Sequence, residues 1–380
     1  MTDETKPSKP IHPSEAPPAD VRSPAMGEIS EDDRQFAEEI LAELEVSPPL
    51  KCLISYTGPG EEETIHRAIT LLKVQALLLR RKHPWLNFDS LDSIVFHSDY
   101  QLALREISER AGRPCEATSE ASGIGLAMVV HLEDKCVAVL DAGIALGIVD
   151  ASDTSRRHLC MDTAMHELCH VHDYDRKRRL LGHEFLKRRL QPIEVHVFTA
   201  AESAWCEYFA NKYSHSACSS PDMHPRHLAE VVPNVVNDVY AAIRSYRVHH
   251  QIDQLLAVCE QKVRLLFQCF GYAAGRLAAT GSTLEEVAPQ SALELKKAGL
   301  WDVWCKTYAE LERLDACREE WTSFDELKAL MAMVDTVFKT LGMHYSANGE
   351  GRRVDIPFTH ETMPNPLAAL VAQLSPNRPS

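Results

Sequence analysis

The sequence lacks a long uninterrupted apolar run. Its uncharged stretches, such as 121–132, are all shorter than the roughly 20 residues that cross a bilayer, so no membrane span and no membrane partner are expected. It also lacks a CxxC pair, and its 11 cysteines are scattered and odd in number, which indicates neither a disulfide framework nor a cysteine-based zinc cluster. Glycine-rich loops with dinucleotide or P-loop spacing are missing as well, which argues against a nucleotide-driven enzyme.

The sequence also has fewer basic than acidic residues, 40 against 55. The formal net charge of −15 repels polyanions, so nucleic acid is not expected as a partner. Two basic runs, 176–179 and 187–189, are interpreted as a solvated helix face or a loop. The first twenty residues carry no apolar core of the kind that a secretory signal needs, and free thiols suit a reducing compartment, so a cytoplasmic location is expected.

A large folded core can nevertheless be built, because 45% of the 380 residues are hydrophobic. Composition and pattern divide the chain into four parts. These are a disordered Pro- and Ser-rich tail at 1–28, an α+β domain at 29–216, a helical region at 217–341 and a loop-rich tail at 342–380.

Within 29–216, strand and helix patterns alternate. Strands are predicted at 51–56 and 93–97 with a helix at 62–82 between them, and the β-rich runs 126–132 and 136–140 suit a hairpin. Asp153 is placed to cap a helix that continues past residue 170. Four downstream helices are predicted near 226–248, 250–277, 302–316 and 324–341.

The predicted helix after Asp153 carries His166, Glu167 and His170. Residues four apart lie on one helix face, so both imidazoles can reach a single ion roughly 2.0–2.1 Å from each nitrogen. Glu167 lies about 100° round the helix from His166, beside the ligands, where its carboxylate can take a proton from a water molecule. Two histidines at this spacing also occur on ordinary amphipathic helices, so a third ligand has to support the interpretation.

A catalytic zinc site needs that third ligand and an open position for water. The residues three and six after His170 are Asp173 and Arg176, which excludes a further histidine ligand from the same helix extension. Another helix must therefore contribute, and residues 199–211 offer two carboxylates, Glu202 and Glu207.

Glu207 is favoured over Glu202. Thr199 and Glu202 have capping-box spacing, which gives Glu202 a structural role at a helix start. Glu207 shares a helix face with small side chains such as Ala204, which would allow close approach to the histidine helix. Glu202 stays open as an alternative, and two weaker candidates are Glu184 and Glu194.

The His-Glu-x-x-His pattern at 166–170, followed 37 positions later by Glu207-x-x-Ala210-Asn211, resembles the gluzincin branch of the zincin metallopeptidases. The second motif of that branch typically reads Glu-x-x-Ala or Ser, then Asp, and the match covers about fifty residues. The resemblance implies that Glu207 is the third ligand and that one Zn²⁺ is bound per chain. Asn211 stands where an Asp usually orients a ligand histidine, and its uncharged amide would polarise that histidine less.

The resemblance also implies a fold and an activity. The fold would be α+β, with a zincin-like core in 29–216, made of a small mixed sheet, an active-site helix and a glutamate helix, and a mostly helical C-terminal region. The edge strand that aligns an extended peptide would lie in the hairpin at 126–140. The expected activity is zinc-dependent hydrolysis of a peptide or protein substrate, with Glu167 as general base.

Other parts of this interpretation stay open. Tyr246 and His249 are the first candidates for a donor to the oxyanion, followed by His250, His344 and Tyr345. One alternative function is a metal-dependent amidohydrolase with a small non-peptide substrate, and another is a non-catalytic interaction protein on a zincin fold. The substrate, the endo- or exopeptidase mode and the oligomeric state do not follow from the sequence.

Overall fold

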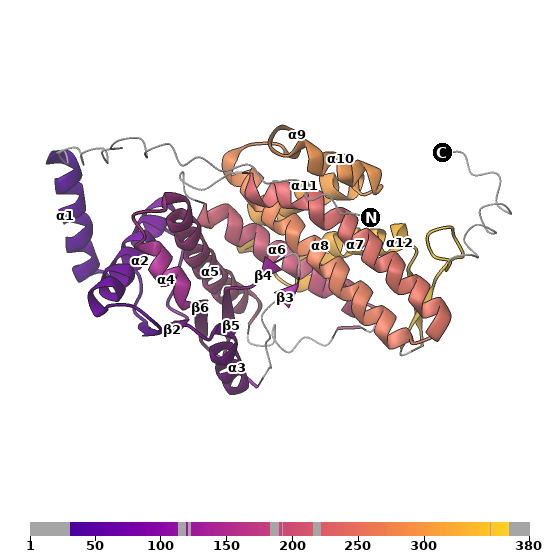
Figure 1. Cartoon of the computed structure of the whole chain (residues 1–380), viewed down its shortest axis with the longest axis horizontal. Helices are drawn as coiled ribbons and strands as arrows, with labels where there is room; N and C mark the ends of the chain where they lie inside the picture. Colours follow the sequence, from indigo (N-terminus) through magenta and orange to yellow (C-terminus); the bar gives the residue numbers. More distant parts are fainter. Residues whose placement is uncertain are drawn as a thin grey trace, which may run out of the picture.

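Figure 1 shows a computed structural model of the chain, which describes residues 31–112, 119–120, 123–182, 190–191, 193–215, 222–349 and 351–364. The predictions made for 1–28, Glu184, 187–189 and 365–380 lie outside these residues. The fold is α+β, with a small sheet at one end of the molecule and long helices at the other. None of the described helices is both long and apolar enough to cross a membrane.

A four-stranded sheet forms the first half of the fold, in the order β1-β2-β6-β5. Its strands are β1 (Leu53–Thr57), β2 (Leu91–His97), β5 (Ala127–His131) and β6 (Cys136–Asp141). The first three strands in this order run parallel, whereas β5 pairs antiparallel with β6. The predicted hairpin is thereby confirmed, and β5 lies at the edge of the sheet.

Helices cover both faces of this sheet. Strand β6 is buried from Cys136 to Leu140, as expected for a strand with both faces covered. Helix α3 (Tyr100–Arg110) packs on one face, and α4 (Ala142–Ile148) and α5 (Thr154–Leu181) pack on the other with α2 (Glu62–Lys82). Helix α1 (Glu31–Val46) extends from α2, and a short pair, β3 (Ser119–Glu120) and β4 (Gly123–Ile124), precedes β5.

Helix α5 begins where the sequence predicts, because the Asp153 carboxylate accepts a hydrogen bond from the Arg156 backbone N–H at 2.9 Å. Helix α6 (Val195–Ser214) follows it. The remaining helices are α7 (Met223–His249), α8 (Ile252–Thr280), α9 (Leu284–Val287), α10 (Pro289–Lys297), α11 (Trp301–Ala316) and α12 (Lys328–Thr340), with 3₁₀ turns η2 (Arg318–Glu320) and η3 (Phe324–Leu327).

The predicted boundary near residue 216 does not separate two hydrophobic cores. One continuous core extends from Leu50 beside the sheet to Ile356 near the C-terminal end of the described chain. Helix α6 packs along α8, so the helices after 216 complete the burial of α6.

The loop-rich tail predicted at 342–380 is wrong for its first part. Residues His344–Asn348 form β7 and Gly351–Asp355 form β8, an antiparallel hairpin. Asn348-Gly349 lies at the turn of this hairpin, with Gly349 at φ 59°. Tyr345 and Ile356 are buried, so this segment contributes to the core.

Candidate metal centre

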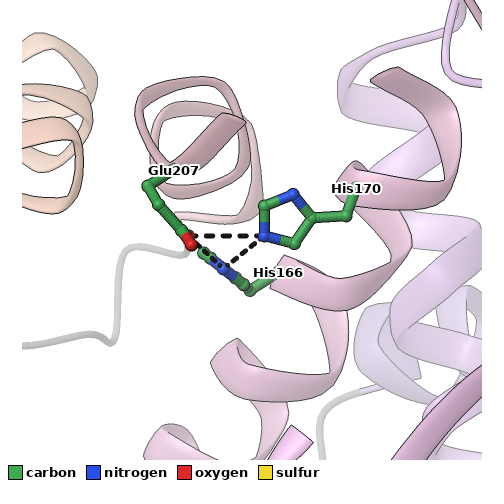
Figure 2. Close-up of side chains that lie close together, drawn as sticks. All are labelled: His166, His170 and Glu207. Carbon is green, nitrogen blue, oxygen red and sulfur yellow. Dashed lines mark hydrogen bonds and ion pairs between the residues drawn. The ribbon is translucent and has the colours of Figure 1, made fainter. Parts of the chain in front are cut away.

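Three side chains from two helices meet at one point. His166 and His170 extend from α5 and Glu207 from α6, as Figure 2 shows. The His166 and His170 Nε2 atoms are 2.9 Å apart, and the Glu207 Oε2 atom lies 3.1 Å from the first and 3.3 Å from the second. The structure therefore brings together the three residues that the sequence predicts as ligands.

These three atoms suit a metal ion in both spacing and chemistry. Ligands at 2.0–2.1 Å from a tetrahedral zinc are separated from one another by about 3.3–3.4 Å, close to the three distances in the cluster. The Glu207 Oε2 atom is buried and, apart from the two imidazole nitrogens at 3.1 and 3.3 Å, has no partner among the described residues. Lone pairs that converge in this way need a cation or shared protons between them. The two-nitrogen, one-oxygen set is one that Zn²⁺ accepts.

The electrostatics of the cluster keep the ligand carboxylate ionised. Burial raises the pKa of Glu207, but the charge and hydrogen bonds of His170 and His166 outweigh it, so the pKa lies well below its usual range. The three side chains are only 12–17% exposed, which leaves a narrow access for water.

Glu167 lies beside this cluster and next to the sheet edge. It is buried, and burial raises the pKa of its carboxyl, with Glu207 adding to the rise while both histidines oppose it. The backbone N–H of Val129 on β5 donates a hydrogen bond to it. Because this N–H points away from β6, the outer edge of β5 faces Glu167.

Helix α8 supplies a wall of the site that the sequence interpretation missed. Gln268 donates from Nε2 to the Glu207 Oε1 atom at 3.0 Å and to the Tyr272 hydroxyl at 3.1 Å. The Tyr272 ring lies 5.8 Å from that of His166 and stacks on His224 at 5.1 Å. Gln268 thus holds one carboxylate oxygen of Glu207 and leaves the other for the histidines.

Two glycines explain how α8 approaches so closely. A Cβ atom at Gly271 would lie 2.3 Å from the Ala204 carbonyl oxygen and 3.0 Å from the Glu207 Cβ, and one at Gly275 would lie 2.4 Å from the Tyr208 carbonyl oxygen. Helix α8 therefore packs closely on the side of α6 that carries Ala204 and Glu207, in addition to the predicted approach of the histidine helix. The sequence feature that indicates this close helix contact is the pair of glycines four residues apart in the predicted helix 250–277.

A buried ionic cluster joins α5 to α6 next to the ligands. The Asp173 carboxylate accepts from the Trp205 indole at 3.1 and 3.2 Å and pairs with Arg176 at 2.7 Å and Lys177 at 2.9 Å. Burial raises the pKa of Asp173, but Lys177 and Arg176 outweigh it, and the pKa lies well below its usual range. The basic run at 176–179 is therefore not a solvated face, because its first two members are buried.

The predicted capping box at Thr199 is wrong. Helix α6 begins at Val195, and the Thr199 hydroxyl donates to the Val195 carbonyl oxygen inside the helix at 3.1 Å. Glu202 instead lies 3.7 Å from Lys177, and Glu194 accepts from the Gln191 backbone N–H at 3.0 Å. Neither carboxylate is part of the three-residue cluster.

Asn211 does not have the partner that the resemblance implies. It is buried, but its amide nitrogen donates to the Glu207 carbonyl oxygen at 3.2 Å, and the described residues show no contact between it and an imidazole. His172, two residues after His170, is also buried. It packs against Phe209 and accepts a hydrogen bond from the Asn87 backbone N–H at 2.9 Å.

The predicted oxyanion donors are not brought to the cluster. His224 marks the end of α7 nearest the metal ligands, and Tyr246 lies 22 residues further along α7, about 33 Å away. His249 and His250 follow at the same distant end of the helix. Tyr345, which follows His344, stacks on His196, eleven residues or about 16 Å from Glu207 on α6.

No protein-family model, curated protein or solved structure matches this chain. Its function is therefore argued from the site itself.

Proposed function

We propose that this chain is a zinc-dependent peptidase of the gluzincin type, with His166, His170 and Glu207 as metal ligands. The observation that carries the proposal is the convergence of these three donor atoms within 3.3 Å of one another, with the buried carboxylate of Glu167 beside them. Zinc, when bound, polarises a carbonyl group and lowers the pKa of a coordinating water toward about 7.

Glu167 acts as the general base. Its raised pKa makes it a better proton acceptor than an exposed glutamate, and it lies next to the ligands without being one of them. It takes the proton of the attacking water and passes it to the leaving amine. The chain therefore supplies both proton steps with one carboxylate.

The edge strand favours a peptide over a small amide. The outer side of β5 carries backbone groups that can pair with an extended chain, and the N–H of Val129 already reaches the base. A peptide that adds to this edge would pass its scissile bond in front of Glu167. An enzyme for a small amide would have no use for such an edge.

Metal analysis tests the site. We expect wild-type protein to carry about one zinc per chain by elemental mass spectrometry, and His166→Ala and Glu207→Ala to bind it at least about 100-fold more weakly. Glu202→Ala is the matched control and should retain the metal, because Glu202 faces Lys177. Metal-free wild-type protein, or full zinc in Glu207→Ala, would refute this ligand set.

Tyr272 is the residue that we assign to the oxyanion. Burial and the nearby Glu207 raise the pKa of its hydroxyl well above the usual value, so it stays a proton donor at neutral pH. We expect Tyr272→Phe to lower kcat for a peptide about 10²–10³-fold with KM and zinc content little changed. Tyr308→Phe removes a hydroxyl that hydrogen-bonds to Glu312 and should leave kcat unaltered. Equal rates for the two variants would contradict the assignment.

A further inference from the structure

Helix α8 presents a polar stripe to the site, formed by Arg264, Gln268, Tyr272 and Arg276 at spacings of four residues. The middle two members line the metal cluster. Arg276 is buried and pairs with Asp162 of α5 at 3.6 Å. Arg264 is the one member of the stripe that is exposed.

The guanidinium of Arg264 has free donors. Its Nε donates to the Ser203 hydroxyl at 3.2 Å, which orients the group, and the described residues show no carboxylate paired with it. Ser203 lies one turn before Glu207 on α6, just as Arg264 lies one turn before Gln268 on α8. The two terminal nitrogens form the edge that binds a carboxylate in bidentate fashion.

A cavity of about 210 Å³ adjoins Arg264, between α6 and α8. Arg264, Gln261 and Thr199 line it together with His196, whose ring nitrogens are buried without a hydrogen-bond partner among the described residues. The acid in its wall, Glu260, is paired with Arg352 at 2.7 Å. The unbalanced charge at the cavity is therefore positive.

We propose that Arg264 and this cavity form a specificity subsite that binds an acidic residue of the substrate. This inference rests on the proposed peptidase function. Ala200 in the cavity wall precedes Glu207 by seven residues, or about 10 Å along α6. An extended peptide spans about 3.3–3.6 Å per residue, so the acidic residue lies two or three positions from the cleaved bond.

Binding and cleavage are measured separately to test the subsite. The probes are two fluorescein-labelled pools of random decapeptides, identical except that one has glutamate and the other glutamine at a fixed position, which is scanned along the peptide. Anisotropy with zinc-loaded Glu167→Gln protein gives binding, and wild-type protein gives cleavage. We expect the protein to bind the glutamate pool about tenfold more tightly than the glutamine pool at one position. Arg264→Gln should abolish this preference. Arg34→Gln, an equal charge change on the distant helix α1, should retain it.

Charge reversal guards against variants that merely misfold. In the Arg264→Glu background the preference should switch to lysine over glutamine at the same position, which an unfolded protein cannot produce. Cleavage without any glutamate preference, or a preference that survives Arg264→Gln, overturns the subsite and leaves the peptidase proposal standing. Arg264-dependent binding without cleavage by wild-type protein supports the subsite and overturns the peptidase proposal. Absence of both binding and cleavage overturns the subsite and the peptidase proposal together.

Discussion

Glu167→Gln should abolish most peptide hydrolysis, with kcat lowered about 10²–10⁴-fold, while the protein keeps about one zinc per chain. Glutamine has the same size as glutamate, and its amide oxygen can accept the hydrogen bond from the Val129 N–H. The amide cannot accept the proton of the attacking water, however. The measurement is single-turnover cleavage of the peptide pool by matched wild-type and variant protein of equal zinc content.

The same change on the neighbouring helix serves as the control. Glu202→Gln removes a carboxylate that faces Lys177 at 3.7 Å and should leave kcat within a factor of about two. If Glu167→Gln retained wild-type turnover, the base would have to be another group, and the mechanism proposed for this site would be wrong.

Asp173→Asn should be among the most destabilising single changes in the chain, lowering the free energy of unfolding by about 3–5 kcal/mol. It leaves the buried Arg176 guanidinium without its counterion and the buried Lys177 ammonium with Glu202 alone, at 3.7 Å. It also weakens the contact with the Trp205 indole, which Asp173 binds. Chemical denaturation at neutral pH measures the loss. Asp238→Asn, which removes a half-exposed partner of Lys262, is the control and should cost less than about 1 kcal/mol.

The effect of Asp173 should depend on pH in a defined direction. Because its pKa in the folded protein lies below its usual value, its stabilisation is fully present above about pH 3.9, the usual value for an unfolded chain. It is lost as the pH falls further, toward the folded pKa. The gap in stability between wild type and Asp173→Asn should therefore narrow only below that pH, and a gap that closed between pH 7 and 5 would contradict the buried ionic cluster.

The sequence was a good guide to which three side chains converge, for a physical reason. Helical periodicity places His166 and His170 on one face whatever surrounds them, and a carboxylate in the middle of a second helix is available for a metal when it has no capping role. Two of the features that favoured Glu207 have other surroundings than predicted, however. Helix α8 packs against α6 beside Glu207, and Glu202 has no capping role because the N-cap of α6 is Glu194, five residues before Thr199.

Residues of α8 could not be assigned from the sequence in the same way. Gln268 and Tyr272 lie more than sixty residues from Glu207, and a helix pattern alone does not state which neighbour a polar stripe faces. Tyr246 and His249 were chosen by residue type, yet the length of α7 carries them far from the ligands.

Local rules thus determined most of what could be known from the sequence by itself: the helix that carries His166, Glu167 and His170, its Asp153 cap, and the hairpin with the edge strand. Those features depend on contacts between residues close together in the chain. The tertiary structure alone decided that α8 packs on Glu207 through its glycines, that Asp173 joins α5 to α6, and that Arg264 faces a cavity beside the site. Such pairings are set by the summed burial of many side chains from distant segments, which no local pattern encodes.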